Sequence, residues 1–159
     1  MKITLITVGK IKEAFYRDAV AEYARRLLPY CQLKIIEVED EPTKEKMSPA
    51  QEEEILNREG HRILQKIPKG SYVAALCIDG RQRDSRAMAA WLEDLPVRGI
   101  SHLTLIIGGS IGLSQEVIRR ADEKISFSAL TFPHQLMRVI VLEQLYRWHR
   151  IIKGEPYHK

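Results

Sequence analysis

The sequence is poor in the residues that build metal and disulfide sites, and it has no long hydrophobic run. Its two cysteines, Cys31 and Cys77, lie far apart without the paired spacing of zinc or redox motifs, so we expect packing roles and no bound metal. No apolar stretch approaches the length that spans a membrane. The opening segment Met1–Gly9 is too short for the apolar part of a signal peptide, which favours a cytoplasmic protein.

The signatures of several large enzyme classes are also missing. The chain has no Gly-Lys-Ser/Thr phosphate loop, no His-Glu-x-x-His metal motif and no serine or cysteine nucleophile in a tight strand-to-helix turn. Its glycine-rich run, residues 108–112, differs in spacing from the dinucleotide fingerprint and lies late in the chain. These absences argue against hydrolases and kinases, and they leave a nucleotide-dependent enzyme of doubly wound fold as a minor alternative.

The composition is that of an ordinary globular protein, with 45% hydrophobic and 29% charged residues in 159, and we expect a single domain over residues 1–159. The net charge is only +4. From His134 onward, however, the basic residues Arg138, Arg147, Arg150, Lys153 and Lys159 outnumber the acidic residues Glu143 and Glu155. Such a basic C-terminal face suits a polyanion such as RNA, and on charge alone a solvated helix face explains it equally well.

Hydrophobic periodicity predicts strands alternating with helices, and therefore an α/β fold with a largely parallel sheet. A helix is expected after the first strand because Ile11, Phe15, Ala19, Tyr23 and Leu27 recur at every fourth position. Ser48-Pro49-Ala50-Gln51 has the spacing of a capping box at a helix start. Strands are expected at 1–9, 33–38, 72–78, 103–107 and 125–127, with helices at 11–27, 48–67, 86–95, 114–121 and 133–153, and with Asp79-Gly80 turning the chain away after the third strand.

Two of these strands end in tight, nearly uncharged loops. The run 103–107 leads into Gly108-Gly109-Ser110-Ile111-Gly112, and the run 125–127 leads into Ser128-Ala129-Leu130-Thr131-Phe132-Pro133. Glycine permits positive φ and lets a ligand approach the main chain closely. Neighbouring loops of this kind predict a site in which main-chain groups hold a flat, polar cofactor.

The same segments carry a resemblance to a known family. Gly108–Leu113, Phe127–His134, the helix Met137–Arg147 and the ending Pro156–Lys159 are similar to the ribosomal RNA large subunit methyltransferase H family, which belongs to the SPOUT methyltransferases. The likeness extends over the whole chain. It implies a homodimeric α/β domain with a C-terminal trefoil knot, which the usual topology rules would not have suggested. It also implies transfer of a methyl group from S-adenosylmethionine to N3 of a pseudouridine in 23S ribosomal RNA of the assembled ribosome.

The resemblance assigns the cofactor to positions on both loops and on one strand. Without it, ordinary packing would be the better explanation for Leu76 and the aromatic side chains. The positions that match the family's cofactor-binding residues are Leu76, Gly108, Phe127, Ser128, Ala129, Leu130, Thr131 and Phe132.

The resemblance also directs attention to the last helix and the tail. His158 is a candidate base or substrate contact, and Tyr157 offers a surface on which a nucleobase can stack. Glu143 and Arg147 are candidate catalytic residues, although their spacing of four residues is equally that of a simple ion pair. His134 and Arg138 could present cations to RNA phosphates. A non-enzymatic RNA-binding or ribosome-assembly factor that uses only the basic face is the main alternative function.

Overall fold

A computed structural model describes residues 1–159, and its elements alternate between strands and helices. The strands are β1 (Lys2–Val8), β2 (Gln32–Val38), β3 (Tyr72–Gln82), β4 (His102–Ile107) and β5 (Glu123–Ser126). The helices are α1 (Ala14–Leu27), α2 (Pro49–Lys66), α3 (Ser85–Val97), α4 (Gln115–Arg120) and α5 (His134–Ile152). None of these helices combines the length and the apolarity that crossing a bilayer requires.

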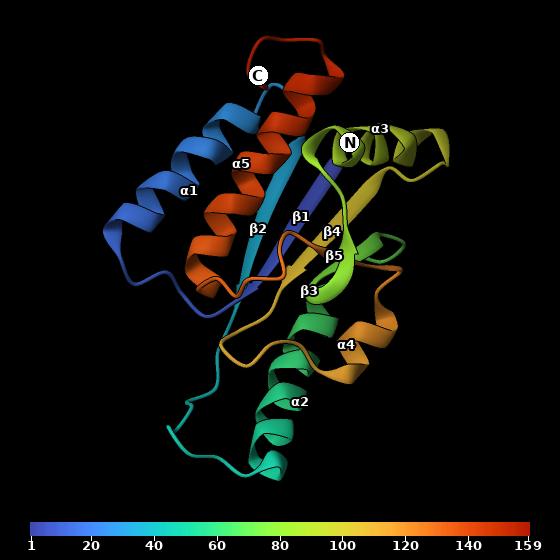
Figure 1. Cartoon of the computed structure of the whole chain (residues 1–159). Coiled ribbons are helices and arrows are strands. Elements are labelled where there is room, and N and C mark those ends of the chain that lie inside the picture. Colours follow the sequence, from blue (N-terminus) through green and yellow to red (C-terminus); the bar gives the residue numbers. More distant parts are fainter.

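The strands form one parallel sheet in the order β2-β1-β4-β3-β5, which confirms the predicted fold class. Helices α1, α3 and α5 cover one face, and α2 and α4 cover the other (Figure 1). A core of 17 buried residues lies under the first group, and a smaller core of 7 lies under the second. Because all strands run in the same direction, their carboxyl ends meet at one edge of the sheet, where the two predicted loops emerge.

The start of α2 follows the predicted capping box. The Ser48 hydroxyl accepts a hydrogen bond from the Gln51 N–H at 3.2 Å, and the Ser48 N–H donates to Oε1 of Gln51 at 2.9 Å. Pro49 occupies the first helical position, where its missing N–H costs nothing. Three consecutive sequence signals therefore fix where this helix begins.

The helix α1 departs from the prediction. It begins at Ala14, so Ile11 lies outside it, and Phe15 is 63% exposed. The buried side of α1 is formed nearer its C-terminal end, where Leu27 is fully buried. A spacing of four drifts slowly around a helix of 3.6 residues per turn, which is why the first residues of the predicted face do not reach the core.

The expected turn at Asp79-Gly80 is also wrong. The strand β3 continues to Gln82, and its pairing with β5 shifts so that Ile125 pairs with Leu76 before the shift and with Arg81 after it. A Cβ on Gly80 would lie 2.5 Å from the carbonyl carbon of Ile125, so residues 77–80 pass directly against the β5 main chain. The trefoil knot stays a prediction.

Candidate functional site

A cavity of about 700 Å³ opens at the sheet edge where β3, β4 and β5 end. This size is within the usual range for sites of small organic ligands. We call it the cofactor cavity. Its lining comes from the middle of β3, from the ends of β4 and β5, from both loops and from the start of α5, and consists of Leu76, Cys77, Ile78, Ile107, Gly108, Gly109, Ser110, Ile111, Gly112, Ile125, Ser126, Phe127, Ser128, Leu130, Thr131, Phe132, Pro133, His134 and Met137.

The glycine loop, residues 108–112, has a geometry that only glycine allows at two positions. Gly112 has a φ of +96°, which side chains disfavour, and a Cβ on Gly108 would lie 2.5 Å from the Gly112 carbonyl oxygen. The Gly112 N–H closes the loop by donating to the Gly109 carbonyl at 3.2 Å. Gly109 and Gly112 thus form an isolated antiparallel bridge, whereas the N–H groups of Ser110 and Ile111 donate to no protein group and are free to bind a ligand.

The second loop, residues 127–133, is held by one serine. The Ser128 hydroxyl accepts the Leu130 N–H at 2.9 Å, while the Ser126 hydroxyl donates to the Ser128 carbonyl at 3.0 Å. Phe127 packs edge-to-face against Trp148 of α5, with ring centroids 6.0 Å apart, which anchors the beginning of the loop. The loop therefore has a defined shape without any charged side chain.

The structure brings the predicted cofactor residues together, with one difference. All of them line the cofactor cavity except Ala129, which lies in the second loop but not in the lining. His134 lines it as well, and burial, followed by the nearby charge of Arg138, lowers the pKa of His134 and favours its neutral ring. Cys77 was expected to be a packing residue, and it is half-buried in the cavity wall.

The predicted catalytic residues form a separate cluster on α5 and the tail, which we call the tail cluster. Arg147 pairs with Glu143 at 2.5 Å, and the Tyr157 hydroxyl donates to the same carboxylate at 3.1 Å. The Arg147 guanidinium lies 4.7 Å from the centre of the Tyr157 ring and 3.4 Å from Nδ1 of His158. Burial raises the pKa of Tyr157 to about 12, with further contributions from Tyr23 and Glu143.

The tail cluster does not face the cofactor cavity of its own chain. Glu143, Arg147 and Tyr157 line neither that cavity nor its neighbour. His158 lines the neighbouring cavity of about 500 Å³, which shares Phe127 and Phe132 with the first. Phe127 and Phe132 thus separate the expected position of the cofactor from His158.

Comparison with known proteins decides the family. The model of a family described as "Predicted SPOUT methyltransferase" matches residues 1–158. The chain belongs to the SPOUT methyltransferase family. Proteins named "Ribosomal RNA large subunit methyltransferase H" from Bifidobacterium adolescentis, Clostridium acetobutylicum and Carboxydothermus hydrogenoformans are 55%, 53% and 52% identical to it, and each alignment covers all of both chains.

Solved structures support the SPOUT fold. A probable methylase family protein from Haemophilus influenzae aligns with a TM-score of 0.55 over 99% of this chain and 70% of its own, at 12% identity. The TrmH/SpoU tRNA modifying enzyme of A. aeolicus aligns with a TM-score of 0.52 over 96% of this chain and 77% of its own, at 15% identity. At such low identities the likeness concerns the fold alone.

Within this SPOUT fold, Arg138 corrects one of our predictions. Its side chain is 1% exposed and donates to the Glu37 carboxylate at 2.7 Å, to the Val8 carbonyl at 2.7 Å and to the Gly9 carbonyl at 2.8 Å. A guanidinium enclosed in this way cannot reach an RNA phosphate. Arg138 instead fastens α5 to the carboxyl end of β1.

Ion pairs within the chain also neutralise much of the charge of the predicted basic C-terminal face. Besides Arg138, Arg147 is paired with Glu143, and Arg150 is paired with Glu155 at 2.7 Å. Arg150 also donates to the Tyr30 hydroxyl at 3.2 Å, and Tyr30 in turn bonds to Glu155. These contacts fix the tail to the end of α1, so most arginines of this region serve the fold.

Proposed function

We propose that the chain transfers the methyl group of S-adenosylmethionine to N3 of a pseudouridine in 23S ribosomal RNA of the assembled ribosome. Membership of a methyltransferase family and relatives named for ribosomal RNA methylation support the reaction and the substrate class. The observation that carries the proposal is the cofactor cavity, in which the second loop meets a glycine loop with free main-chain N–H groups at the sheet edge. The particular nucleotide and the assembled ribosome follow from the family resemblance.

The cavity fits an adenosyl and methionine ligand. It combines apolar walls from Leu76, Ile107 and Phe132 with the free N–H groups of residues 110–111, which suit a carboxylate or a ring nitrogen. A Cβ on Gly108 would fill the space in which the loop closes. We expect the methionine part near Leu76 and Gly108, and the adenine against main-chain groups of residues 127–132.

When bound, S-adenosylmethionine would supply a methyl group on a positively charged sulfur; a bond from the acceptor nitrogen to the methyl carbon would form as the carbon–sulfur bond breaks and the neutral thioether leaves. The chain's task is mainly placement, because holding two reactants in line removes much of the entropic barrier. The glycine loop and the second loop restrict where the methyl group lies. Phe127 and Phe132 form an apolar wall beside it, which keeps water from competing with the RNA base.

The acceptor nitrogen must lose a proton, and the tail cluster offers a way to assist. Arginine has no hydrogen-bond acceptor, so its contact with His158 uses the lone pair on Nδ1 and leaves Nε2 as the ring donor. His158 would then donate a hydrogen bond to the base oxygen on which negative charge develops, while the N3 proton passes to solvent water. Glu143 holds Arg147 and Tyr157 in place through a single carboxylate.

A second copy of the chain would bring these parts together. Glu143, Arg147 and Tyr157 lie outside the cavity of their own chain, and Phe127 and Phe132 separate His158 from it, which favours the tail of another copy as the one that reaches the methyl group. In a twofold dimer, each tail can complete the partner's cavity by the same contact. The homodimer implied by the resemblance supplies this arrangement.

Two measurements test the proposal. Calorimetric titration with S-adenosylmethionine should give binding heat, whereas a purely RNA-binding assembly factor should give none. Mapping of N3-methyl marks on 23S ribosomal RNA from cells with and without the gene should show one pseudouridine mark that depends on the gene. Binding heat without any lost mark would contradict the proposed substrate, and absence of heat would contradict the enzyme.

A further inference from the structure

One buried acidic side chain lies directly behind the glycine loop. Glu59 of α2 is only 4% exposed. Its Oε1 accepts the main-chain N–H of Glu41 at 3.0 Å, whereas its Oε2 is buried without a hydrogen-bond partner. Buried carboxyl oxygens are nearly always hydrogen bonded, so the free Oε2 marks a position with a requirement other than stability.

The free oxygen faces the main chain of Gly109. A Cβ on Gly109 would lie 3.1 Å from Oε2 of Glu59 and 3.2 Å from Cγ1 of Val8. Gly109 also lines the cofactor cavity. A single residue therefore separates the acid from the space in which the cofactor is expected.

The next residue of α2 holds the far end of the loop region. A Cβ on Gly60 would lie 2.2 Å from the Ser114 hydroxyl oxygen, so only glycine allows this approach of the helix. Ser114 follows the glycine loop and caps α4 by accepting the Val117 N–H at 3.3 Å. Glycine inside a helix lowers stability by about 1 kcal/mol relative to alanine. The close contact with Ser114 explains why glycine occupies this position despite that cost. Glu59 and Gly60 thus support the loop region at two points.

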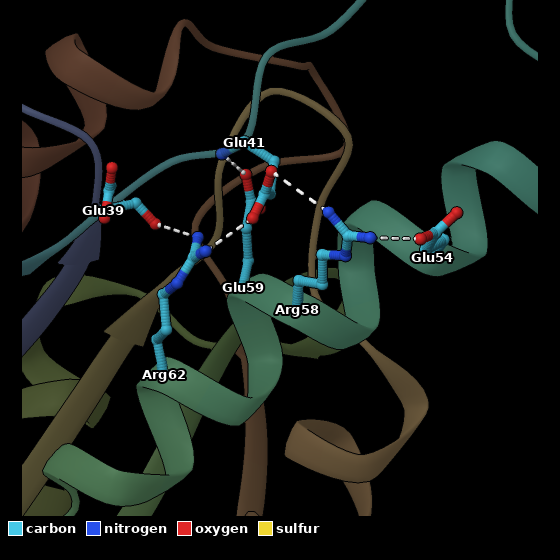
Figure 2. A network of polar contacts seen from close by, with 6 residues as sticks. All are labelled: Glu39, Glu41, Glu54, Arg58, Glu59 and Arg62. Atoms are coloured by element: carbon cyan, nitrogen blue, oxygen red, sulfur yellow. Dashed lines mark hydrogen bonds and ion pairs between the residues drawn. The ribbon is translucent and has the colours of Figure 1, made fainter.

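Charged pairs hold Glu41, the partner of Glu59, in position. The Glu41 carboxylate lies 2.5 Å from Arg62 and 3.9 Å from Arg58, and Arg62 also donates to the main-chain oxygen of Glu39 at 3.0 Å. Figure 2 shows Glu41 above Glu59, with the two arginines of α2 reaching toward it. This network fixes one carboxyl oxygen of Glu59 and leaves the other directed at the loop.

We propose that Glu59 is a positioning residue whose buried carboxyl group supports Gly109 and keeps the free N–H groups of the glycine loop facing the cofactor. This inference rests on the proposed function, because it takes the loop to be part of the S-adenosylmethionine site. An ionised carboxylate behind the loop would attract those N–H groups inward and repel the carboxylate of a methionine group.

The electrostatics around Glu59 agree with a neutral acid. Burial raises the pKa of Glu59, and the nearby Asp40 and Glu41 carboxylates raise it further. The Glu41 N–H and Arg62 act in the opposite direction. Since the proton is retained to higher pH than in an exposed glutamate, cofactor affinity should fall as pH rises through the pKa of Glu59.

The first test compares four proteins by titration with S-adenosylmethionine from pH 5 to pH 9. We expect Glu59→Gln, a neutral isostere, to bind within about threefold of wild type at low pH and to lack the decline at high pH. Glu59→Ala should bind about tenfold more weakly, a change of about 1.4 kcal/mol, with little change in kcat at saturating cofactor. Glu54→Gln is the matched control, because Glu54 is exposed on the same helix and pairs only with Arg58.

The second test is a double-mutant cycle with Gly109→Ala, whose added Cβ would press on Glu59 Oε2. The loss of affinity caused by Gly109→Ala should be several-fold smaller in the Glu59→Ala background, where the contact with Oε2 is gone and only the contact with Val8 remains. If Glu59→Ala does not fold, the pH profiles of wild type and Glu59→Gln decide alone.

The outcomes separate this inference from the proposed function. A wild-type protein that binds no S-adenosylmethionine removes the function itself. A wild type that binds, together with a Glu59→Gln variant that keeps the pH decline or an additive cycle, overturns the role of Glu59 only. An unchanged Glu59→Ala affinity would also overturn it.

Discussion

The cofactor cavity and the tail cluster are built from opposite kinds of polar group. In the cavity, the polar groups include the main-chain N–H groups of Ser110 and Ile111, which no protein atom engages. In the cluster, they are side chains that satisfy one another, since Arg147 and Tyr157 share the Glu143 carboxylate. Main-chain groups fixed by the fold provide a site that is ready for a ligand. The paired side chains form a rigid unit that has to be brought to a cavity, which favours a partner's cavity over their own.

The two regions also respond to acid in opposite directions. Behind the glycine loop, burial raises the pKa of Glu59, so low pH preserves its neutral form. Near the tail, burial lowers the pKa of His149 to about 4, so its ring is neutral in the folded chain and low pH favours its protonation. Mild acid should therefore loosen the end of α5 before it disturbs the cofactor loop.

The largest expected effect is a loss of catalysis without a change in cofactor binding. Replacing His158 by alanine should lower the single-turnover methylation rate on the order of 100-fold or more, because proton handling or charge stabilisation is lost. Calorimetry should give an unchanged affinity for S-adenosylmethionine. An unchanged methylation rate would remove His158 from the mechanism.

The complementary change breaks the cofactor site while sparing the tail. In Gly108→Ala, the new Cβ would lie 2.5 Å from the Gly112 carbonyl oxygen, so the loop cannot close as before. We expect the affinity for S-adenosylmethionine to fall about 100-fold, since overpacking of this kind costs about 1 to 3 kcal/mol. Calorimetry measures the affinity, and circular dichroism checks that the fold is retained.

Mixing these two variants sharpens the comparison further. If the tail of one chain serves the cavity of another, random heterodimers of Gly108→Ala and His158→Ala would each contain one intact site, and about a quarter of wild-type activity should return. Mixing either variant with itself is the control. No recovery after confirmed subunit exchange would place both parts of the site in one chain.

A smaller effect concerns Arg138, which links the start of α5 to β1. Arg138→Gln should lower the free energy of unfolding by about 2 kcal/mol, because the Val8 and Gly9 carbonyls lose a buried donor. RNA affinity per folded molecule should not change. Denaturant unfolding measures the stability, and RNA titration measures the affinity. A loss of RNA affinity at unaltered stability would instead support the original prediction that Arg138 contacts an RNA phosphate.

The smallest effect is the acid response of the tail region. His149 stacks on Tyr30 with ring centroids 5.5 Å apart, and its Nε2 is buried without a partner. Because the unfolded chain takes up a proton near pH 6.5 and the folded one only near pH 4, stability should fall by about 1 kcal/mol between pH 6 and pH 5. In His149→Phe, the free energy of unfolding should depend less on pH in this acid range. If the dependence is unchanged, groups other than His149 cause it.

The alternation of elements and the capping box were predictable because both depend on local patterns. Ser48 and Gln51 satisfy each other within one turn, so no distant contact can override them. The irregular pairing of residues 77–80 beside β5 was not predictable. Asp79-Gly80 has the local chemistry of a turn, and only the contact with Ile125 keeps these residues in β3. Long-range packing decides such cases.

In the site, the loops were predictable and the charged residues were less so. The glycine loop carries its geometry in its composition, whereas the surroundings of Arg138 depend on Glu37 and on carbonyl groups more than a hundred residues away. Glu59 was missed because it looked like one more charge on the surface of a helix. Its neighbour Gly60 was the available signal, because a glycine in mid-helix usually has a packing reason.

The most direct test of the account titrates S-adenosylmethionine into the wild-type chain and into a chain that ends at Gly154. If the cofactor site lies between the two loops and does not need the tail, both proteins bind one molecule per chain with similar affinity, and only the full chain methylates RNA. Absence of binding to the wild type, or loss of binding when the tail is removed, would contradict that claim.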